Sequence, residues 1–165
     1  MLPFTPPARH IDADFAASLT QPLTPAGYLT LRREAAGFSP EQLARALVML
    51  DDHRRPLPCR RLTLEQGRTR YRRMLDLVRL LERRGSVTRC RDTLAAIASL
   101  FPFDPAVYRA LVDAPADSHP RICRSCGCSG HDACIDHHEN VCRWVTPKIC
   151  SACVSQIGAS LAVAA

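Results

Sequence analysis

Apolar side chains recur three and four residues apart in several stretches of this chain, and glycine, proline or charged residues separate the stretches. This spacing gathers apolar side chains on one face of an α-helix. In the first stretch we expect Arg32, Arg33 and Glu34 to face water. Asp92 and Asp104 are the expected N-caps of the last two helices. The predicted helices span residues 27–37, 39–47, 63–84, 92–100 and 104–112.

The second helix has the clearest start signal in the chain. Ser39 is its expected N-cap, Pro40 stands at its first position, and Gln42 can complete a capping box. Gly37 lies in the turn before it and ends the first helix. Two short helices joined by a glycine-containing turn are the opening of a helix-turn-helix. The prolines between Asp51 and Arg61 prevent that segment from being helical throughout.

Composition and the apolar pattern divide the chain into five parts. Residues 1–26 are rich in proline and predict an arm, and residues 27–114 form a small helical domain. Residues 115–120 are a linker to a cysteine-rich module at 121–154, and 155–165 form an alanine-rich tail. The expected fold class is mainly α, a helix-turn-helix-like domain followed by a small metal-stabilised, zinc-ribbon-like module.

Positive charge is concentrated in one part of the chain. The net charge is +6, and residues 28–91 hold 16 arginines against 7 acidic residues, a local excess of +9. Clustered positive charge suits a polyanion such as double-stranded DNA, because phosphate neutralisation releases counterions. The alternative is a set of solvated helix faces in an arginine-rich composition, since the chain has 21 arginines and one lysine.

The sequence gives no sign of a membrane partner or of export. No apolar run approaches the roughly 20 residues that span a bilayer. The first ten residues lack a basic segment followed by an apolar one, which a secretory signal would need. We therefore expect a cytoplasmic protein, and this expectation disfavours a disulfide framework for the cysteines, which requires an oxidising compartment.

Seven of the nine cysteines lie between residues 123 and 153. Two Cys-x-x-Cys pairs bound this segment, Cys123 with Cys126 and Cys150 with Cys153. Each pair is expected on a tight turn, and two such turns facing each other form a tetrahedral four-sulfur zinc site. In so small a module, bound metal would supply most of the folding free energy.

The inner cysteines admit several interpretations. They can be inert small hydrophobes beside the zinc, ligands of a second zinc together with one histidine, or ligands of an iron–sulfur cluster. A Cys128–Cys134 disulfide is a further alternative. Trp144 is expected to pack over the metal turn, although an exposed tryptophan could stack on a base. The residues concerned are Cys128, Cys134 and Cys142, with His131, His137 and His138 close by.

Residues 26–47, with a Leu-Arg-Arg-Glu-Ala-Ala-Gly-Phe-Ser run and the Leu43-Ala44 pair, resemble the first two helices of the lambda-repressor-like (XRE-type) helix-turn-helix family. Residues 92–103 look like later scaffold helices of that fold. The resemblance implies DNA binding through a recognition helix that reads the major groove. Here, however, a proline-broken arginine segment stands where that helix should begin.

The groove-facing element is therefore expected either around residues 51–61 or at the start of the helix at Thr63. Thr, Gln and Arg side chains at a helix start can contact bases or phosphates. The Ser39 helix is expected to position its N-terminal N–H groups near a phosphate. The candidate DNA-binding residues are Ser39, Gln42, Arg60, Arg61, Gln66, Arg68, Arg70 and Arg73.

Residues 122–153 resemble a cysteine-rich module found after XRE-like regions in uncharacterised phage and alphaproteobacterial proteins. The sequence contains no deaminase signature, P-loop or dinucleotide-binding glycine turn, so we expect no enzymatic activity. The expected function is DNA binding, transcription-regulatory in kind, with a structural zinc site. The alternatives are a regulator that senses metal or redox state through an iron–sulfur cluster, and an adaptor whose arginines meet an acidic protein.

Overall fold

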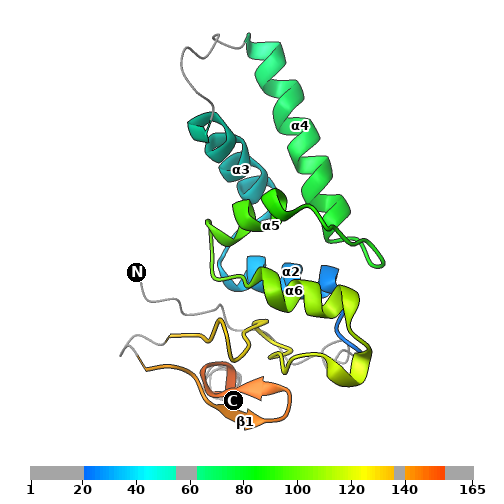
Figure 1. The fold of residues 1–165 in the computed structure, drawn as a ribbon. Coiled ribbons are helices and arrows are strands. Elements are labelled where there is room, and N and C mark those ends of the chain that lie inside the picture. The colour runs from blue at the N-terminus through cyan, green and yellow to red at the C-terminus, as the bar shows by residue number, and fades with distance from the viewer. Residues whose placement is uncertain (1–20, 55–62, 136–139, 155–165) are drawn as a thin grey trace, which may run out of the picture.

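The computed structural model describes residues 21–54, 63–135 and 140–154, and it is mainly helical, as the apolar pattern predicts. Figure 1 shows three tiers: a helical arm, a central layer of helices, and the cysteine-rich segment. In chain order the elements are α2 (Pro25–Ala35), α3 (Pro40–Arg54), α4 (Leu64–Leu81), α5 (Arg91–Ala98), α6 (Pro105–Asp113), the 3₁₀ turn η1 (Ala116–Ser118), β1 (Trp144–Thr146) and β2 (Ile149–Cys150).

Helix α2 begins earlier than the apolar pattern predicts. Thr24 is its N-cap, with the side-chain oxygen accepting from the Gly27 N–H at 3.0 Å, and Pro25 occupies the first turn. The helix therefore starts inside the segment that was expected to be an arm. Its start carries the same polar-residue-then-proline signal that marks the start of α3 at Ser39.

Two further helix boundaries differ from expectation. Helix α3 continues to Arg54, past the predicted end at Leu47, because the first proline that blocks it is Pro56. Helix α5 begins at Arg91 with Cys90 as its N-cap, so the prediction that Asp92 caps this helix is wrong. Asp92 lies instead in the first turn, where its carboxylate favours the positive end of the helix dipole.

Helices α3 and α4 form an antiparallel hairpin that extends away from the other helices (Figure 1). Ion pairs join the two helices at both ends of the hairpin. Near the tip, Arg70 of α4 pairs with Asp51 and Asp52 of α3. Near the base, Arg79 pairs with Glu41 at 3.0 Å. The α3–α4 hairpin, called the helical arm from here on and distinct from the proline-rich segment 1–26, is therefore held by ion pairs as well as by apolar contacts between the two helices.

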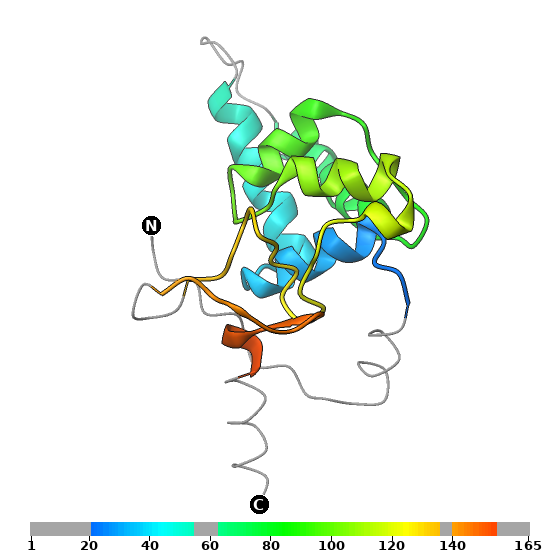
Figure 2. The same cartoon turned by 60° about the horizontal axis from the view of Figure 1, so that its bottom comes forward.

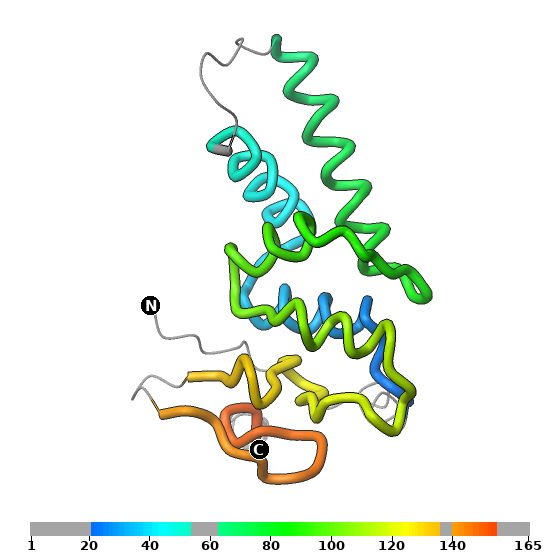
Figure 3. Tube along the Cα trace, in the orientation of Figure 1, coloured from blue at the N-terminus to red at the C-terminus, as the bar shows by residue number. Residues whose placement is uncertain are grey.

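The central layer holds the main hydrophobic core. Helices α2 and α6 run side by side across it (Figure 3). The ring of Tyr28 on α2 stacks on Phe103 with centroids 5.2 Å apart, and Phe103 also contacts Tyr108 of α6. Fully buried aromatic rings dominate such a core energetically. Other buried members are Leu29, Leu43, Leu47, Val78, Leu81, Leu94, Ile97, Phe101, Val107, Leu111 and Ile122.

The prediction that Arg32 and Arg33 face water is wrong. Their exposed fractions are 1% and 5%. Helix α2 is covered on more than one side, because helices pack against its apolar stripe and the cysteine-rich segment lies along another side (Figure 2). The Arg33 guanidinium meets Glu82 at the end of α4, with N–O distances of 2.5 and 3.0 Å, and donates to the Phe38 carbonyl.

Candidate functional site

The two Cys-x-x-Cys pairs meet at one point. The Sγ atoms of Cys123, Cys126, Cys150 and Cys153 all lie within 4.8 Å of one another, and the four side chains are at most 1% exposed. Two of the separations, Cys123–Cys153 and Cys126–Cys150, are 3.8 Å. A tetrahedron of sulfur atoms about 2.3 Å from a zinc ion has edges of about 3.8 Å. The four thiols therefore fit a tetrahedral metal ion.

The first cysteine pair lies on a turn that backbone hydrogen bonds hold closed. The Gly127 N–H donates to the Cys123 carbonyl at 2.8 Å, and the Cys123 N–H donates to the Cys128 carbonyl at 2.8 Å. Gly127 has φ of +76°, a conformation that favours glycine. The second pair begins with the last residue of β2, Cys150, and Cys153 follows the strand. The Arg124 N–H donates to the Lys148 carbonyl and so joins the first cysteine turn to the β1–β2 hairpin.

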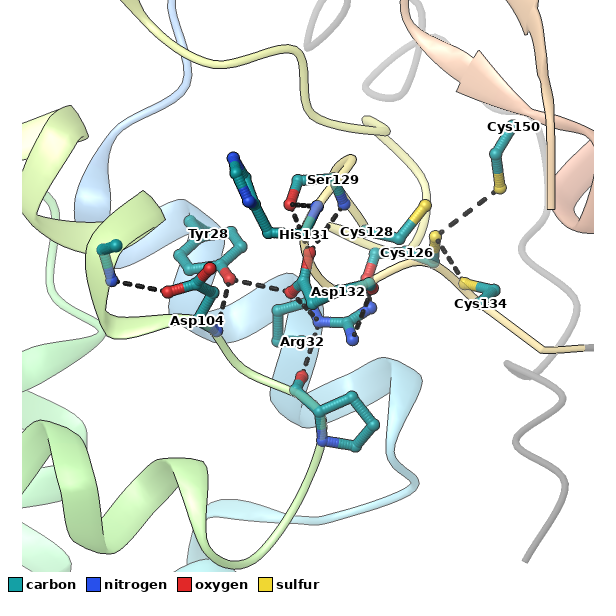
Figure 4. Close-up of polar contacts among 12 residues, drawn as sticks. Tyr28, Arg32, Asp104, Cys126, Cys128, Ser129, His131, Asp132, Cys134 and Cys150 are labelled. Atoms are coloured by element: carbon teal, nitrogen blue, oxygen red, sulfur yellow. Dashed lines mark hydrogen bonds and ion pairs between the residues drawn. The ribbon is translucent and has the colours of Figure 1, made fainter. Parts of the chain in front are cut away.

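Two of the inner cysteines form a second four-sulfur group. The Sγ atoms of Cys126, Cys128, Cys134 and Cys150 also lie within 4.8 Å of one another, and all four side chains are buried. Figure 4 shows Cys126 between Cys134 and Cys150, at Sγ–Sγ distances of 3.4 and 3.8 Å. Cys142 is partly exposed and lies 3.7 Å from Cys128, outside both groups.

The histidines and the tryptophan differ in their relation to the sulfur atoms. His131 is exposed, belongs to neither four-sulfur group, and its ring points away from the cysteines in Figure 4. His137 and His138 lie outside the described residues. Trp144 packs against the cysteine cluster, and the Arg121 guanidinium lies 4.3 Å above its ring. The tryptophan thus covers the cluster, as expected for the packing alternative.

The cysteines in the described residues are free thiols. A disulfide needs sulfur atoms about 2.0 Å apart. Each Sγ–Sγ contact within the cluster is 3.4 Å or longer, so these contacts are not bonds. The separations fit ligands around a common cation better than a covalent framework.

The sulfur atoms alter one another's ionisation. Hydrogen bonding with Cys126 lowers the pKa of Cys123 to about 3 and that of Cys134 to about 4. The pKa of Cys126 is raised, first by hydrogen bonding with Cys123. The cluster therefore divides its protons unevenly among closely spaced thiols. A bound cation removes this competition, because it stabilises the thiolate form of every ligand at once.

A buried arginine ties the cysteine segment to helix α2. The Arg32 guanidinium donates to the Pro102 carbonyl at 2.6 Å, the Cys126 carbonyl at 3.4 Å and the Asp132 carbonyl at 3.2 Å. It also pairs with the Asp132 carboxylate at 3.1 Å (Figure 4). Burial alone would lower the pKa of Arg32, but the combined charges of Asp132, Cys134, Tyr28 and Cys126 raise it above its ordinary value. The guanidinium stays charged in a closed site.

Asp132 collects three further hydrogen bonds. The Tyr28 hydroxyl donates to it at 2.9 Å and accepts from the Asp104 N–H at 2.9 Å. The backbone N–H and hydroxyl of Ser129 donate to its other oxygen at 2.7 and 2.5 Å. Burial raises the pKa of Tyr28 above its ordinary value, and the Asp132 charge adds to the effect, so the phenol remains a donor.

The cysteine segment therefore shares a packed interface with α2. A Cβ added at Gly127 would lie 2.8 Å from Arg32 Cδ, so backbone and helix approach closely here. Ala35 of α2 belongs to the same buried cluster as the cysteines. Residues 115–120 thus join two parts of the chain that also pack directly against each other. The sequence pattern does not identify Tyr28, Arg32 and Asp132 as residues of the site. The one signal for them is that Arg32 lies four residues after Tyr28, on the same face of the helix.

Five of the candidate DNA-binding residues either form helix caps or lie outside the described residues. Ser39 and Gln42 form the capping box of α3, at 2.7 and 3.1 Å. Gln66 closes the equivalent box of α4 with Thr63. The two arginines at 60 and 61 lie outside the described residues.

The remaining candidates lie on α4. Arg70 points toward α3 and pairs with Asp51 and Asp52, so its charge is compensated within the arm. Arg68 and Arg73 are exposed on the outward side of the helix. The structure thus separates one arginine that holds the arm together from two that face solvent.

Protein-family models, curated proteins and solved structures provide no match to this chain. Within the described residues no helix is long and apolar enough to cross a membrane. The buried cysteine groups are compatible with a metal site. The assignment of function therefore depends on the geometry of the cysteine cluster and on the distribution of charge.

Proposed function

We propose that this protein binds double-stranded DNA through the outward side of α4, acts in transcription regulation, and contains zinc in a structural role. The observation that carries the proposal is the row of exposed arginines along that helix. They are Arg68, Arg72, Arg73 and Arg79.

The charge on this part of the chain is unbalanced. Residues 63–84 contain seven arginines and three acidic residues, a net charge of +4. Among the seven, Arg70 is compensated by α3, and Arg79 pairs with Glu41 on the exposed surface, where such a pair contributes little. Because the arm extends away from the central layer, its outward side is open to a long polyanion (Figure 1).

The arrangement of helices supports the same function. Helix α2, the turn with Gly37 at φ +73° and helix α3 have the order of a helix-turn-helix. Helix α4 begins nine residues after α3 ends, which is later than the recognition helix of the XRE-type family whose sequence this region resembles. We therefore place the DNA contact on α4 as part of the proposal.

The cysteine geometry supports zinc as the metal and a structural role for it. Four thiolates close the coordination of a tetrahedral ion, and closed four-sulfur sites are structural, because catalytic zinc keeps an open position. The four thiolates of an iron–sulfur cluster are divided among two or more iron atoms, so they do not all converge within 4.8 Å of one another as these four do. Iron would colour the purified protein brown, which gives a simple check.

Two double variants of equal charge test the DNA interface. Arg68→Ala with Arg72→Ala removes two exposed arginines from the tip half of α4, and Arg83→Ala with Arg84→Ala removes two from the opposite end. Anisotropy titrations with a fluorescent duplex measure affinity at several salt concentrations. We expect the first variant to bind roughly tenfold more weakly at low salt, with a salt slope smaller by about 1.8, since each phosphate contact contributes about 0.9. The second variant should lose less than about threefold.

The outcomes are distinct. Equal losses from the two variants would show general attraction without a defined binding face. Absence of binding to any duplex by the unaltered protein at low salt would overturn the DNA proposal in favour of an acidic protein partner. Circular dichroism of each variant shows whether the helices are intact, so a loss of affinity is not confused with unfolding.

A further inference from the structure

The two four-sulfur groups are not separate. They share Cys126 and Cys150, whose Sγ atoms are 3.8 Å apart (Figure 4). We propose that the cysteines hold two divalent metal ions, and that the thiolates of Cys126 and Cys150 bridge them. This inference rests on the metal-binding part of the proposed function and adds the stoichiometry and the identity of the bridging ligands.

The arrangement corresponds to two tetrahedra with a common edge. Cys123 and Cys153 complete the first tetrahedron, and Cys128 and Cys134 complete the second. The shared edge of 3.8 Å matches the sulfur–sulfur separation of about 3.8 Å in a tetrahedral zinc site. Two ions on opposite sides of such an edge, each about 2.3 to 2.5 Å from the bridging sulfurs, lie about 3 Å apart.

A single ion in the outer site leaves the inner thiols without a role. Cys128 and Cys134 are as buried as the outer ligands, at 0% and 1% exposure. A buried cysteine often acts as a small hydrophobe, but apolar packing does not require its sulfur to converge on one point with three others. The Sγ atoms of Cys134 and Cys126 are only 3.4 Å apart, which is the proximity of ligands to a common ion.

Charge balance permits the second ion. One divalent ion with four thiolates carries a net charge of −2. Two divalent ions with six thiolates, those of Cys128 and Cys134 included, also carry a net charge of −2, because the bridging thiolates serve both ions. The buried site therefore accommodates the second cation without additional net charge.

Cys142 provides an internal control. Its Sγ atom lies 3.7 Å from that of Cys128, but it is partly exposed and belongs to neither tetrahedron. The proposal assigns it no coordination bond. If instead the second ion used the ligand set of three inner cysteines and a histidine, Cys142 would be essential to it and Cys126 would not bridge.

Metal content per chain tests the proposal. The full chain and single cysteine-to-serine variants are purified anaerobically, and zinc and iron are measured by elemental analysis. We expect two zinc ions in the unaltered protein, two in Cys142→Ser, one in Cys128→Ser and Cys134→Ser, and fewer than one in Cys126→Ser and Cys150→Ser. X-ray absorption should show metal–metal scattering at about 3 Å in the unaltered protein, and none in Cys134→Ser.

The Cys126→Ser and Cys150→Ser variants lose a bridging thiolate and can fail to fold. Cys134→Ser and Cys142→Ser are therefore the decisive pair, because both retain the four outer ligands and keep the structural site. One ion in the unaltered protein, with the same content in Cys134→Ser, would overturn the binuclear centre and leave the structural zinc site standing. Two ions without metal–metal scattering, with one lost in Cys142→Ser, would show two separate sites. Absence of bound metal would overturn the binuclear centre and the proposed zinc site together, while leaving DNA binding to its own test.

Discussion

Replacing Arg32 by methionine tests whether the buried ion pair fastens the cysteine segment to α2. The substitution keeps an apolar stem of similar length but removes the guanidinium, its pairing with Asp132 at 3.1 Å and its hydrogen bonds to three backbone carbonyls. Removing one partner of a buried pair costs about 3–5 kcal/mol, because the other charge is left uncompensated. Asp132 keeps the donors from Tyr28 and Ser129, so we expect a loss of about 3 kcal/mol, near the lower end of that range.

Urea unfolding followed by circular dichroism gives the change in the free energy of unfolding, and a chromogenic chelator gives the rate of metal release under native conditions. The matched control is Arg33→Met. Arg33 is also buried and also pairs with a carboxylate, but that carboxylate is Glu82 at the end of α4. Both variants should be less stable, whereas only Arg32→Met should release metal faster, because only Arg32 contacts the segment that carries the cysteines.

Two results would refute this reasoning. A loss of less than about 1 kcal/mol for Arg32→Met would mean that the pair contributes no more than a surface ion pair. Equal rates of metal release from the two arginine variants would mean that Arg32 has no specific influence on the cluster. Combining Arg32→Met with Asp132→Asn closes a double-mutant cycle, in which a coupling energy near zero would show that the two groups act independently.

Two further predictions concern single backbone features. Gly127→Ala should cost more than about 2 kcal/mol, because it adds a Cβ 2.8 Å from Arg32 Cδ to a left-handed backbone at φ +76°. Gly37→Ala is the control, since Gly37 has φ +73° but no atom within 4 Å of the added Cβ, and it should cost only about 1–2 kcal/mol for the backbone conformation. Equal losses of stability in urea unfolding would contradict the close approach at Gly127. Thr63→Ala removes the capping box of α4 and should lower the free energy of unfolding by about 1 kcal/mol. The control is Thr69→Ala on the exposed side of the same helix, which should be neutral or slightly stabilising in thermal unfolding. A neutral Thr63→Ala variant would show that the cap contributes little.

The helices were predictable because their signals are local. Apolar spacing depends on neighbours within one or two turns, and Ser39 and Pro40 mark the start of α3 in two consecutive residues. The same signal stands at Thr24 and Pro25, where α2 begins. It was overlooked because the high proline content of the first 26 residues favoured an arm. A cap signal is therefore more informative than the composition around it.

The burial of Arg32 could not be predicted from local sequence. A charged residue on a short helix faces water unless something covers it, and what covers Arg32 lies about 100 residues away, at Asp132. The cysteines show the same division between local and distant information. Spacing alone identifies the two outer pairs, but the path of the chain from Gly127 to Cys134 decides that Cys128 and Cys134 join them.

Helix α2 physically joins the two parts of the molecule to which we assign functions. Arg32 and Arg33 are adjacent, so their side chains leave the helix about 100° apart. One reaches Asp132 beside the cysteine cluster, and the other reaches Glu82, which caps the end of α4. Both contacts are buried ion pairs whose geometry tolerates little displacement. The proposed metal would therefore stabilise one side of the same short helix that fixes the base of the α3–α4 hairpin, and we expect its removal to weaken the support of α4 as well as that of the cysteine segment.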